Sequence, residues 1–411
     1  MGETRDLDIV RLGAQGDGIA DMTSGTVFVP YALPGEHVRA DVPGERGRLL
    51  EVVVPSLERT TPVCQHFTHC GGCAMQHMEP NAYLAWKRQL VVDAFAARNI
   101  DASVAPVIGA GLGARRRATF AARRTGHGVI LGFHEARGRD IVDLHMCPVT
   151  VPEIVRALPG LRALVAPLLS RRGEARLVVT LASNGLDLAI EGVRGDLSPD
   201  ACERLAHDAS VLKLARVSIG TDTLYQAAEP IIRIGAASVV PPPGAFLQAA
   251  PAAEAEMVQL VTSAMPKAKR IADLFCGLGT FALPLGALAQ VLAVDDNRDA
   301  IAALEGAARR TPGLKPMQLK VRDLFPEPLS VKELEPFDAV VFDPPRAGAA
   351  AQAAMLAKSK VATIAAVSCN PATLARDART LIDGGYRLDA VTPIDQFLFS
   401  AHIEAVAIFR R

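Results

Sequence analysis

The chain begins with short apolar runs that Gly and Pro residues interrupt, a pattern typical of β-strands joined by tight turns. It predicts strands at residues 7–12, 26–29, 37–42 and 48–54. Short strands of this kind close most naturally into a small barrel, because a closed sheet leaves few unpaired edges. The sequence therefore predicts a β-barrel domain over residues 1–57.

A helical pattern follows the predicted barrel. Apolar residues recur near a 3.6-residue period between residues 81 and 99, which predicts one helix that packs on a larger domain. The next region mixes β-like runs, such as 176–181 and 186–191, with Pro and Gly breaks. The Pro-Pro-Pro-Gly run at 241–244 resembles a linker end, so a central α+β domain is expected over residues 58–245.

Strand and helix signals alternate through the last third of the chain. This alternation is typical of an α/β domain with a doubly wound, mainly parallel sheet, expected here over residues 246–411. Strands are predicted at 270–275, 290–294, 317–321, 339–342 and 363–368, and helices start near 281, 298, 350 and 372.

Overall charge and cysteine content limit the class of protein. The 44 basic and 44 acidic side chains give zero net charge, so any nucleic-acid site must be a local patch. Seven cysteines without a secretory leader indicate reduced thiols or metal ligands, and predict a cytoplasmic protein. The most apolar stretch, residues 282–294, is interrupted by Pro284 and is too short to cross a bilayer. We expect no membrane association and no obligate protein partner.

Cys369 stands where the apolar run ending at Val367 meets a predicted helix over residues 372–381. Open α/β sheets place reactive groups at the carboxyl ends of their strands, and a helix amino terminus can favour a thiolate. A lone cysteine, however, is more often a small buried apolar residue. Position alone leaves both interpretations open.

Glycines and carboxylates gather at the predicted strand ends. Residues 273–280, Asp-Leu-Phe-Cys-Gly-Leu-Gly-Thr, follow the first strand and open a helix, so the backbone there can approach a cofactor closely. Asp295, Asp323 and Asp343 end the next three strands. A carboxylate at the second strand end can accept both ribose hydroxyls of an adenosine, which predicts a nucleoside-bearing cofactor. Each aspartate alone is also a common cap or turn residue.

These motifs resemble those of a known enzyme family. The glycine motif followed by Asp-Pro-Pro at 343–345 is similar to the class I S-adenosylmethionine-dependent methyltransferases, which have a Rossmann-like fold. Ser-Cys-Asn-Pro-Ala-Thr-Leu-Ala-Arg-Asp at 368–377, Asp-Pro-Pro-Arg-Ala-Gly at 343–348 and His-Ile-Glu at 402–404 resemble the RNA 5-methyluridine methyltransferases, a resemblance that covers nearly the whole chain. It implies Cys369 as nucleophile and Glu404 as general base. The implied cofactor-binding residues are Gln248, Phe275, Thr280, Asp295, Asp323 and Asp343.

The implied reaction explains these residue types. C5 of uracil becomes nucleophilic only after a thiolate adds to C6, and a base must later remove the C5 proton. A thiol with a pKa near 8.5 is little ionised at pH 7, so the helix after Pro371 is expected to favour the thiolate of Cys369. The target base must leave its stack to reach that thiol.

Four cysteines, Cys64, Cys70, Cys73 and Cys147, form a second candidate site. Four thiolates suit either zinc or an iron–sulfur cluster, and their spacing leaves the choice open. The run Cys-Gly-Gly-Cys-Ala-Met-Gln-His at 70–77 is similar to the cluster-binding branch of the same family. That resemblance implies a [4Fe-4S] cluster that is structural or contacts RNA.

The amino-terminal barrel resembles a TRAM domain, an oligonucleotide-binding-like module that implies RNA as a partner. Residues 1–60 carry a net charge of −4, which is unfavourable for RNA binding by the barrel alone. Residues 114–176 carry +7, with arginines together at 115–117, 123–124 and 171–172. These arginines form either an RNA-facing patch that contacts phosphates or a solvated basic face.

The barrel and the four cysteines together resemble the ribosomal branch of the family, whereas the tRNA branch lacks both features. This resemblance implies methylation of 23S ribosomal RNA. A tRNA uracil-C5 methyltransferase is the alternative enzyme. A non-catalytic RNA-binding or assembly protein with the same fold is the alternative of a different class.

Overall fold

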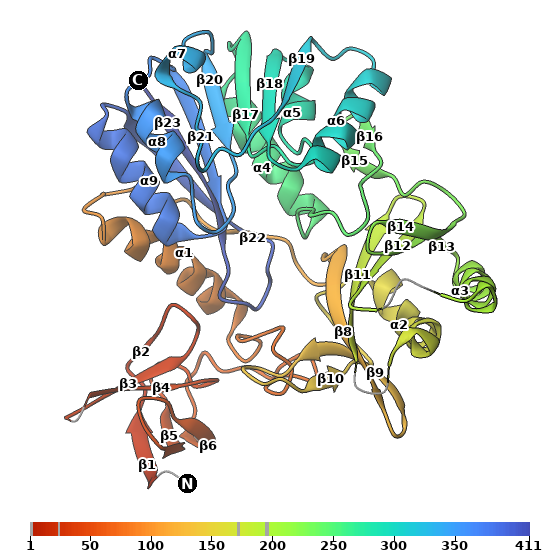
Figure 1. Ribbon diagram of the computed structural model, residues 1–411. Coiled ribbons are helices and arrows are strands. Elements are labelled where there is room, and N and C mark those ends of the chain that lie inside the picture. The colour runs from red at the N-terminus through yellow and green to blue at the C-terminus, as the bar shows by residue number, and fades with distance from the viewer. Residues whose placement is uncertain (1–2, 24, 171–172, 194–196) are drawn as a thin grey trace.

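The computed structural model describes residues 3–23, 25–170, 173–193 and 197–411. Figure 1 shows a small β part at the amino terminus, a mixed part in the middle of the chain and a large α/β part at the carboxyl terminus. No helix within these ranges is long and apolar enough to cross a membrane.

The amino-terminal part consists of two antiparallel three-stranded sheets. One has the order β1-β5-β6 (Glu3–Asp8, His37–Val42, Arg48–Val54) and the other β2-β3-β4 (Arg11–Leu12, Gly18–Met22, Gly25–Val29). Both contribute to one apolar core, in which Val29 and Val38 are fully buried. The barrel predicted over residues 1–57 thus consists of two sheets around one core, and the name barrel is used below for this two-sheet unit. The strand predicted at 7–12 is divided between β1 and β2, because the chain passes from one sheet to the other at Ile9 and Val10.

Helix α1 (Pro80–Ala96) corresponds to the helix predicted at 81–99. The Glu79 carboxylate caps it by accepting hydrogen bonds from the amides of Asn81 (2.8 Å) and Ala82 (2.9 Å). Its buried side chains are Tyr83, Trp86, Lys87, Val91 and Phe95. It packs against α9 (Pro371–Asp383) and β22 (Arg387–Asp395), so this early segment belongs to the core of the last part of the chain (Figure 1).

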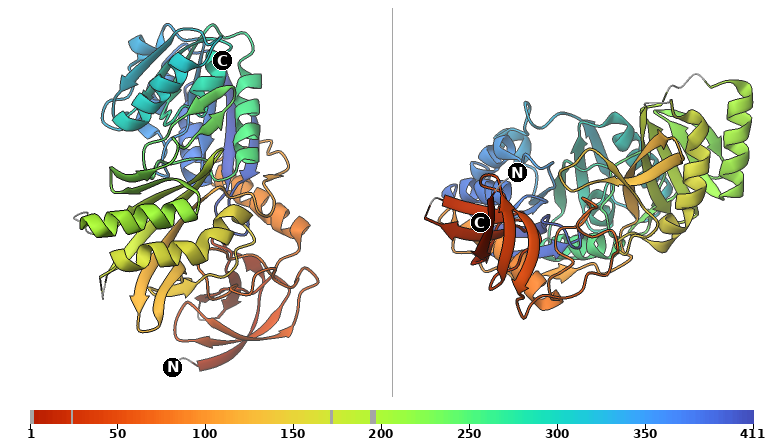
Figure 2. Two further views of the ribbon diagram at one scale, coloured as in Figure 1. Left: turned by 90° about the vertical axis from the view of Figure 1, so that its right-hand side faces the viewer. Right: turned by 90° about the horizontal axis from the view of Figure 1, so that it is seen from below.

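The middle part is a seven-stranded sheet with the order β10-β9-β8-β11-β12-β13-β14. Its helices α2 (Pro152–Val165) and α3 (Pro199–Val211) cover one face, as the left view of Figure 2 shows. The hairpin β15–β16 (Ile232–Ile234, Ala237–Val239) leads on to the last part. The sheet strands are β8 Arg117–Thr125, β9 Gly128–His134, β10 Ile141–Asp143, β11 Glu174–Ala182, β12 Gly185–Glu191, β13 Leu214–Ile219 and β14 Asp222–Gln226.

The carboxyl-terminal part is an eight-stranded sheet with the order β19-β18-β17-β20-β21-β23-β22-β7. Strands β19 to β21 are parallel and β23 is antiparallel to both of its neighbours, which matches the predicted doubly wound, mainly parallel sheet. The strands not yet defined are β7 Ile108–Gly109, β17 Arg270–Leu274, β18 Gln290–Asp295, β19 Met317–Val321, β20 Ala339–Phe342, β21 Thr363–Ser368 and β23 Glu404–Arg410.

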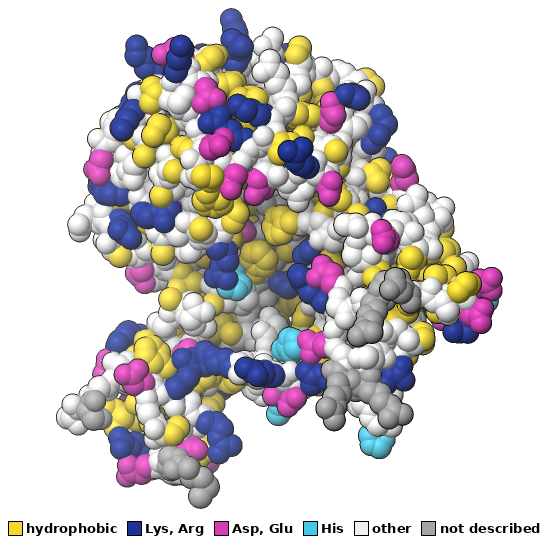
Figure 3. Space-filling model, in the orientation of Figure 1, with side chains coloured by type: hydrophobic (Ala, Val, Ile, Leu, Met, Phe, Trp, Pro, Cys, Tyr) yellow, Lys and Arg dark blue, Asp and Glu magenta, His cyan; other side chains and the backbone are white. Residues whose placement is uncertain are grey.

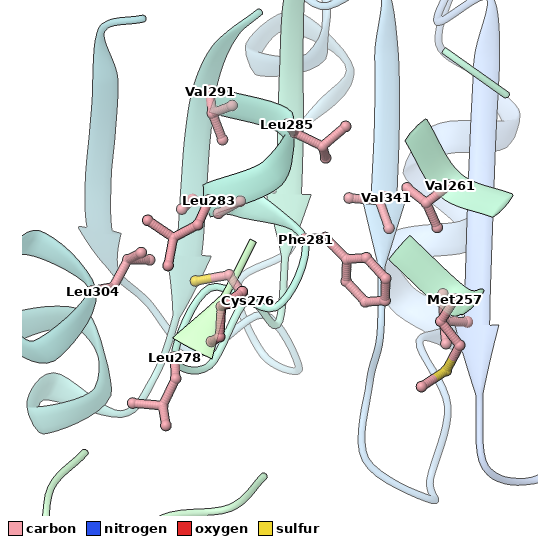
Figure 4. Packing of buried hydrophobic residues seen from close by; sticks show 14 of the residues in the cluster. Met257, Val261, Cys276, Leu278, Phe281, Leu283, Leu285, Val291, Leu304 and Val341 are labelled. Carbon is pink, nitrogen blue, oxygen red and sulfur yellow. The ribbon is translucent and has the colours of Figure 1, made fainter. Parts of the chain in front are cut away.

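Helices cover both faces of this sheet. One face carries α4 (Pro251–Ala264), α5 (Ala282–Gly286) and α6 (Arg298–Arg310). The other carries α1, α7 (Val331–Leu334), α8 (Ala350–Ala357) and α9. Figure 4 shows Cys276 within the first core, near Leu278, Leu283 and Leu304, so this cysteine serves packing. The strand order reverses between β17 and β20, the place where open α/β sheets bind their ligands.

Candidate active site

A cavity of about 450 Å³ opens at the carboxyl ends of β17, β18, β20 and β21. Figure 3 shows the molecule hollowed below this edge of the sheet, with Lys and Arg side chains along the border. The structure brings all eight predicted catalytic and cofactor-binding residues to the cavity wall: Gln248, Phe275, Thr280, Asp295, Asp323, Asp343, Cys369 and Glu404.

The loop after β17 reaches the cavity through residues with positive φ, namely Phe275 (+61°), Gly277 (+51°) and Gly279 (+91°). A Cβ on Gly279 would lie 2.5 Å from Leu304 Cδ1, so only glycine fits there. The Gly277 amide donates a hydrogen bond to Asp295 Oδ2 at 2.8 Å. The loop is thus fixed to the end of β18 beside the cavity.

Two carboxyl groups at the cavity are joined by two glutamine side chains. Gln248 Nε2 donates to Asp343 Oδ2 at 2.9 Å. Gln396 Nε2 donates to Gln248 Oε1 at 2.6 Å and to Glu404 Oε1 at 2.9 Å. The Ala249 amide donates to Gln396 Oε1 at 2.7 Å, which fixes the orientation of that side chain. Glu404 Oε2 is buried and has no hydrogen-bond partner among the described residues.

Burial raises the pKa of both carboxyl groups. For Asp343 the hydrogen bond from Gln248 opposes this rise. For Glu404 the neighbouring Asp343 carboxylate raises the pKa further, and the hydrogen bond from Gln396 opposes it. Because each carboxylate disfavours ionisation of the other, the two titrate as a pair.

Cys369 lies between β21 and α9, at the strand end where the sequence predicts it. The expectation that the helix favours its thiolate is wrong for this state. Burial raises the pKa of Cys369 to about 11; the Glu404 and Asp343 carboxylates add to the rise and Arg346 opposes it. The side chain of Asn370 caps α9 by accepting a hydrogen bond from the Ala372 amide.

A second cavity, of about 900 Å³, also reaches Cys369. Cys369 and Arg346 line both cavities. The other walls of the second cavity include residues 10–12 of the barrel, Trp86 of α1 and residues 401–403. The thiol is therefore accessible to one reactant from each cavity.

Comparison with known proteins decides the family. The chain is 48% identical over 411 residues to an uncharacterized RNA methyltransferase of Brucella suis, covering 100% of this chain and 98% of that protein. It is 32% identical over 426 residues to the 23S rRNA (uracil(1939)-C(5))-methyltransferase RlmD of Chromohalobacter salexigens, covering 98% and 89%. Residues 327–411 match the family model described as tRNA (uracil-5-)-methyltransferase. The chain belongs to the RNA uracil-C5 methyltransferase family.

A solved structure shows the same fold. The tRNA (uracil-54, C5)-methyltransferase of Pyrococcus abyssi superposes with a TM-score of 0.75 at 22% identity, covering 98% of this chain and 100% of that one. This likeness confirms the predicted fold class. The protein is an S-adenosylmethionine-dependent RNA methyltransferase, as predicted.

Two arginines of the predicted basic patch bind other parts of the methyltransferase itself. Arg116 is buried, and its Nη2 donates to the Glu254 carboxylate at 2.7 Å while Nε donates to the Gln248 carbonyl at 3.2 Å. Arg117 Nε donates to the Ala245 carbonyl at 3.0 Å. The prediction that Arg116 faces RNA is therefore wrong, because its side chain is buried. Arg117 is half-buried and binds the same segment that carries Gln248.

The remaining arginines of the patch have different contacts and different positions. Arg123 pairs with Glu174 at 2.8 Å, and Arg124 donates to a backbone carbonyl at the surface. The Arg115 guanidinium lies 5.7 Å from the Phe397 ring centroid, near the active site. Arg171 and Arg172 lie outside the described residues.

Sequence reasoning missed two buried residues of this methyltransferase site. Asp273 is fully buried, and within the described chain its oxygens make no hydrogen bond of normal geometry. Burial, reinforced by Asp343, raises its pKa, and the nearby Ala282 amide opposes the rise. An acid inside the apolar run of β17 was a usable signal for Asp273. Gln396 follows β22 without any such signal.

The four predicted cluster ligands occur in two neighbouring segments. Burial raises the pKa of Cys64, Cys70 and Cys73, and the charge of Cys147 adds to each rise, so Cys147 lies in the same neighbourhood as the other three. Across the described ranges, no three His, Cys, Asp or Glu side chains are grouped so as to hold a single metal ion. A Cβ at Gly71 would lie 2.9 Å from the His134 carbonyl oxygen, so glycine permits the close approach of this loop to β9.

Proposed function

We propose that this methyltransferase forms 5-methyluridine in 23S ribosomal RNA through a covalent bond between Cys369 and C6 of the target base. The observation that carries the proposal is the position of the Cys369 thiol beside Glu404 and on two cavities. Support for the ribosomal substrate comes from the named 23S rRNA relative, and from the presence of both a barrel and four clustered cysteines.

The first cavity is the proposed cofactor site. Asp295 is suited to the ribose hydroxyls, and Phe275, Thr280, Asp323, Gln248 and Asp343 line the remaining wall. The absence of a side chain at Gly279 lets the loop approach Leu304 of α6, and the Gly277 amide binds Asp295 at the end of β18. S-adenosylmethionine, when bound, supplies an activated methyl group.

The chain's own residues carry the remaining chemistry. The Cys369 thiolate adds to C6, and the electron pair of the C5–C6 bond becomes available at C5 for methyl transfer. The Glu404 carboxylate then takes the C5 proton, and expulsion of the thiolate restores the double bond. Arg346 is the neighbouring cation that favours the thiolate.

A [4Fe-4S] cluster on Cys64, Cys70, Cys73 and Cys147 is part of the proposal. Each thiolate of such a cluster binds a different iron, so the ligands are spaced more widely than around one metal ion. The neighbouring thiols and the glycine at position 71 fit this group. We expect iron and inorganic sulfide in anaerobically purified protein and their loss in Cys70→Ser. Stoichiometric zinc without iron would overturn this assignment.

The substrate is tested with labelled cofactor and separate pools of unmodified ribosomal and transfer RNA. We expect 5-methyluridine in 23S rRNA and no label in tRNA. Label only in tRNA would replace the ribosomal substrate by the alternative one. No label in either pool, with cofactor bound normally, would favour a non-catalytic RNA-binding protein.

A further inference from the structure

Gln396 occupies a position that its neighbours in sequence do not explain. It is 2% exposed, follows β22, and reaches across the sheet edge to the segment before α4. Its Oε1 is held by the Ala249 amide, so both hydrogens of Nε2 are directed to Gln248 and Glu404. Both N–H donors of the Gln396 side-chain amide, and its oxygen, are therefore engaged in hydrogen bonds.

The resulting chain of hydrogen bonds has a fixed direction. Gln248 accepts from Gln396 and therefore presents Nε2 to Asp343. At the other end, Glu404 receives Nε2 of Gln396 on Oε1, which leaves Oε2 as the oxygen without a partner among the described residues. The side-chain amides of Gln248 and Gln396 thus position Asp343 at one end of the chain of hydrogen bonds and Glu404 at the other.

We propose that Gln396 is a positioning residue that couples Glu404 to the cofactor side of the cavity through Gln248. The inference rests on the proposed function, in which Asp343 and Gln248 contact the cofactor and Glu404 accepts the C5 proton. Loss of the Gln396 amide would leave Glu404 buried without its donor and would free Gln248 to rotate away from Asp343.

The coupling lets the charge of the cofactor change the proton affinity of Glu404. The groups that face Glu404 are Asp343 and Cys369, and Arg346 faces Cys369 from the rim. The cofactor's sulfonium is a cation before methyl transfer, whereas the demethylated product is neutral. A cation in this cavity favours ionised carboxyl groups, and its loss raises their proton affinity. Glu404 is then most basic at the stage when the C5 proton must leave.

The first measurement is proton release on ligand binding, by calorimetry of the wild-type protein at pH 7 in buffers of different ionisation enthalpy. We expect S-adenosylmethionine to release more protons than S-adenosylhomocysteine, because only the former brings the sulfonium charge. Equal release for the two ligands would overturn the coupling, and this test needs no variant.

The second measurement compares Gln396→Leu with Gln352→Leu, which removes another buried glutamine that lines neither cavity. For Gln396→Leu we expect less proton release and an alkaline shift of the pH–rate profile by about one unit, the effect of losing a charge-assisted hydrogen bond. A methylated protein–RNA adduct should accumulate on denaturing gels and decline at higher pH. Gln352→Leu should behave as wild type at the site.

The outcomes separate this inference from the proposed function. Wild-type protein that binds no cofactor or forms no adduct defeats the proposed function itself. Wild-type activity with an unchanged pH profile and unchanged proton release in Gln396→Leu defeats only the role of Gln396. If Gln396→Leu does not fold, Gln396→Glu replaces it, and the same alkaline shift is expected because a carboxylate would then face Glu404.

Discussion

At the scale of single residues, the proposed reaction depends on two groups, Cys369 and Glu404, whose charged forms their surroundings disfavour. Burial and neighbouring carboxylates hold Cys369 as a thiol and raise the pKa of Glu404. Both are therefore suited to hold a proton until the RNA and the cofactor change the charge around them.

Replacing Cys369 by Ala should abolish methyl transfer, by at least about 10³-fold, because Cys369 is the one described cysteine that lines both cavities, whereas Cys276 reaches only the first. Cofactor affinity should stay within about twofold, since the change removes no charged group. Labelled transfer and calorimetry measure the two quantities. Retained turnover would show that another group is the nucleophile.

Glu404→Gln should alter the pH dependence of stability. Burial raises the pKa of Glu404 from 4.5 to about 8. Its contribution is therefore fully present below pH 4.5 and is lost as the pH rises through 8. Relative to wild type, Glu404→Gln should have a similar Tm at pH 4.5 and a Tm higher by about 5 °C at pH 9. Parallel Tm curves for the two proteins would contradict the assigned environment.

At the scale of elements, α1 fixes the loop that leads into Glu404. Lys87 Nζ donates to Asp395 Oδ1 at 2.9 Å and to the His402 carbonyl, and the Tyr83 hydroxyl donates to Asp395 Oδ2 at 2.6 Å. Lys87 and Asp395 have no exposed side-chain surface. We call residues 396–403, between β22 and β23, the catalytic loop, because they lead into Glu404. Lys87 thus connects α1, which precedes the predicted methyltransferase domain, to both ends of this loop.

Lys87→Met should lower the free energy of unfolding by about 3 kcal/mol or more, because it leaves the Asp395 carboxylate buried without a cation. Methyl transfer should fall in the folded fraction as well, since the His402 carbonyl loses its donor. Denaturant unfolding and rate measurements test both effects. The exposed Lys332→Met is the matched control, and an equal loss in that variant would contradict the prediction.

Arg116→Met should weaken cofactor binding by about tenfold or more, because Arg116 binds both Glu254 and the carbonyl of Gln248. RNA affinity and its salt dependence should change little, since this guanidinium is buried. Arg124→Met, at an exposed arginine of β8, the strand that follows Arg116, should leave cofactor affinity unchanged. A reduced salt slope for Arg116→Met would restore the phosphate-contact interpretation.

At the scale of the whole molecule, Asp17 connects the barrel to the middle part. Its carboxylate accepts hydrogen bonds from Arg137 at 3.0 Å and from Arg46 of the barrel, although it is 5% exposed. Asp17→Asn should make cleavage in the exposed connection at residues 55–63 about tenfold faster in limited proteolysis, because the docked state loses an ion pair. Asp21→Asn, which affects an exposed pair within the barrel, should leave the cleavage rate unchanged.

The sequence predicted what local patterns encode. Apolar runs ending in Asp295, Asp323, Asp343 and Cys369 were sufficient to place these residues at one sheet edge, because parallel strands bring their carboxyl ends together. The role of Arg116 was not predictable in this way, since its partner Glu254 lies 138 residues further along the chain. For Lys87 and Gln396 as well, burial and partner depend on contacts between distant segments.

The contacts of the cysteine loop with the catalytic loop have a consequence for biosynthesis. The amides of Ala74 and Met75 donate to the Phe399 carbonyl, and the Phe399 amide donates to the Tyr83 hydroxyl 316 residues earlier in the chain. A nascent chain therefore exposes the cysteines and α1 on the ribosome long before their partner segment is translated. The proposed catalytic pair, Cys369 and Glu404, therefore acquires its supporting contacts only after these last segments have left the ribosome.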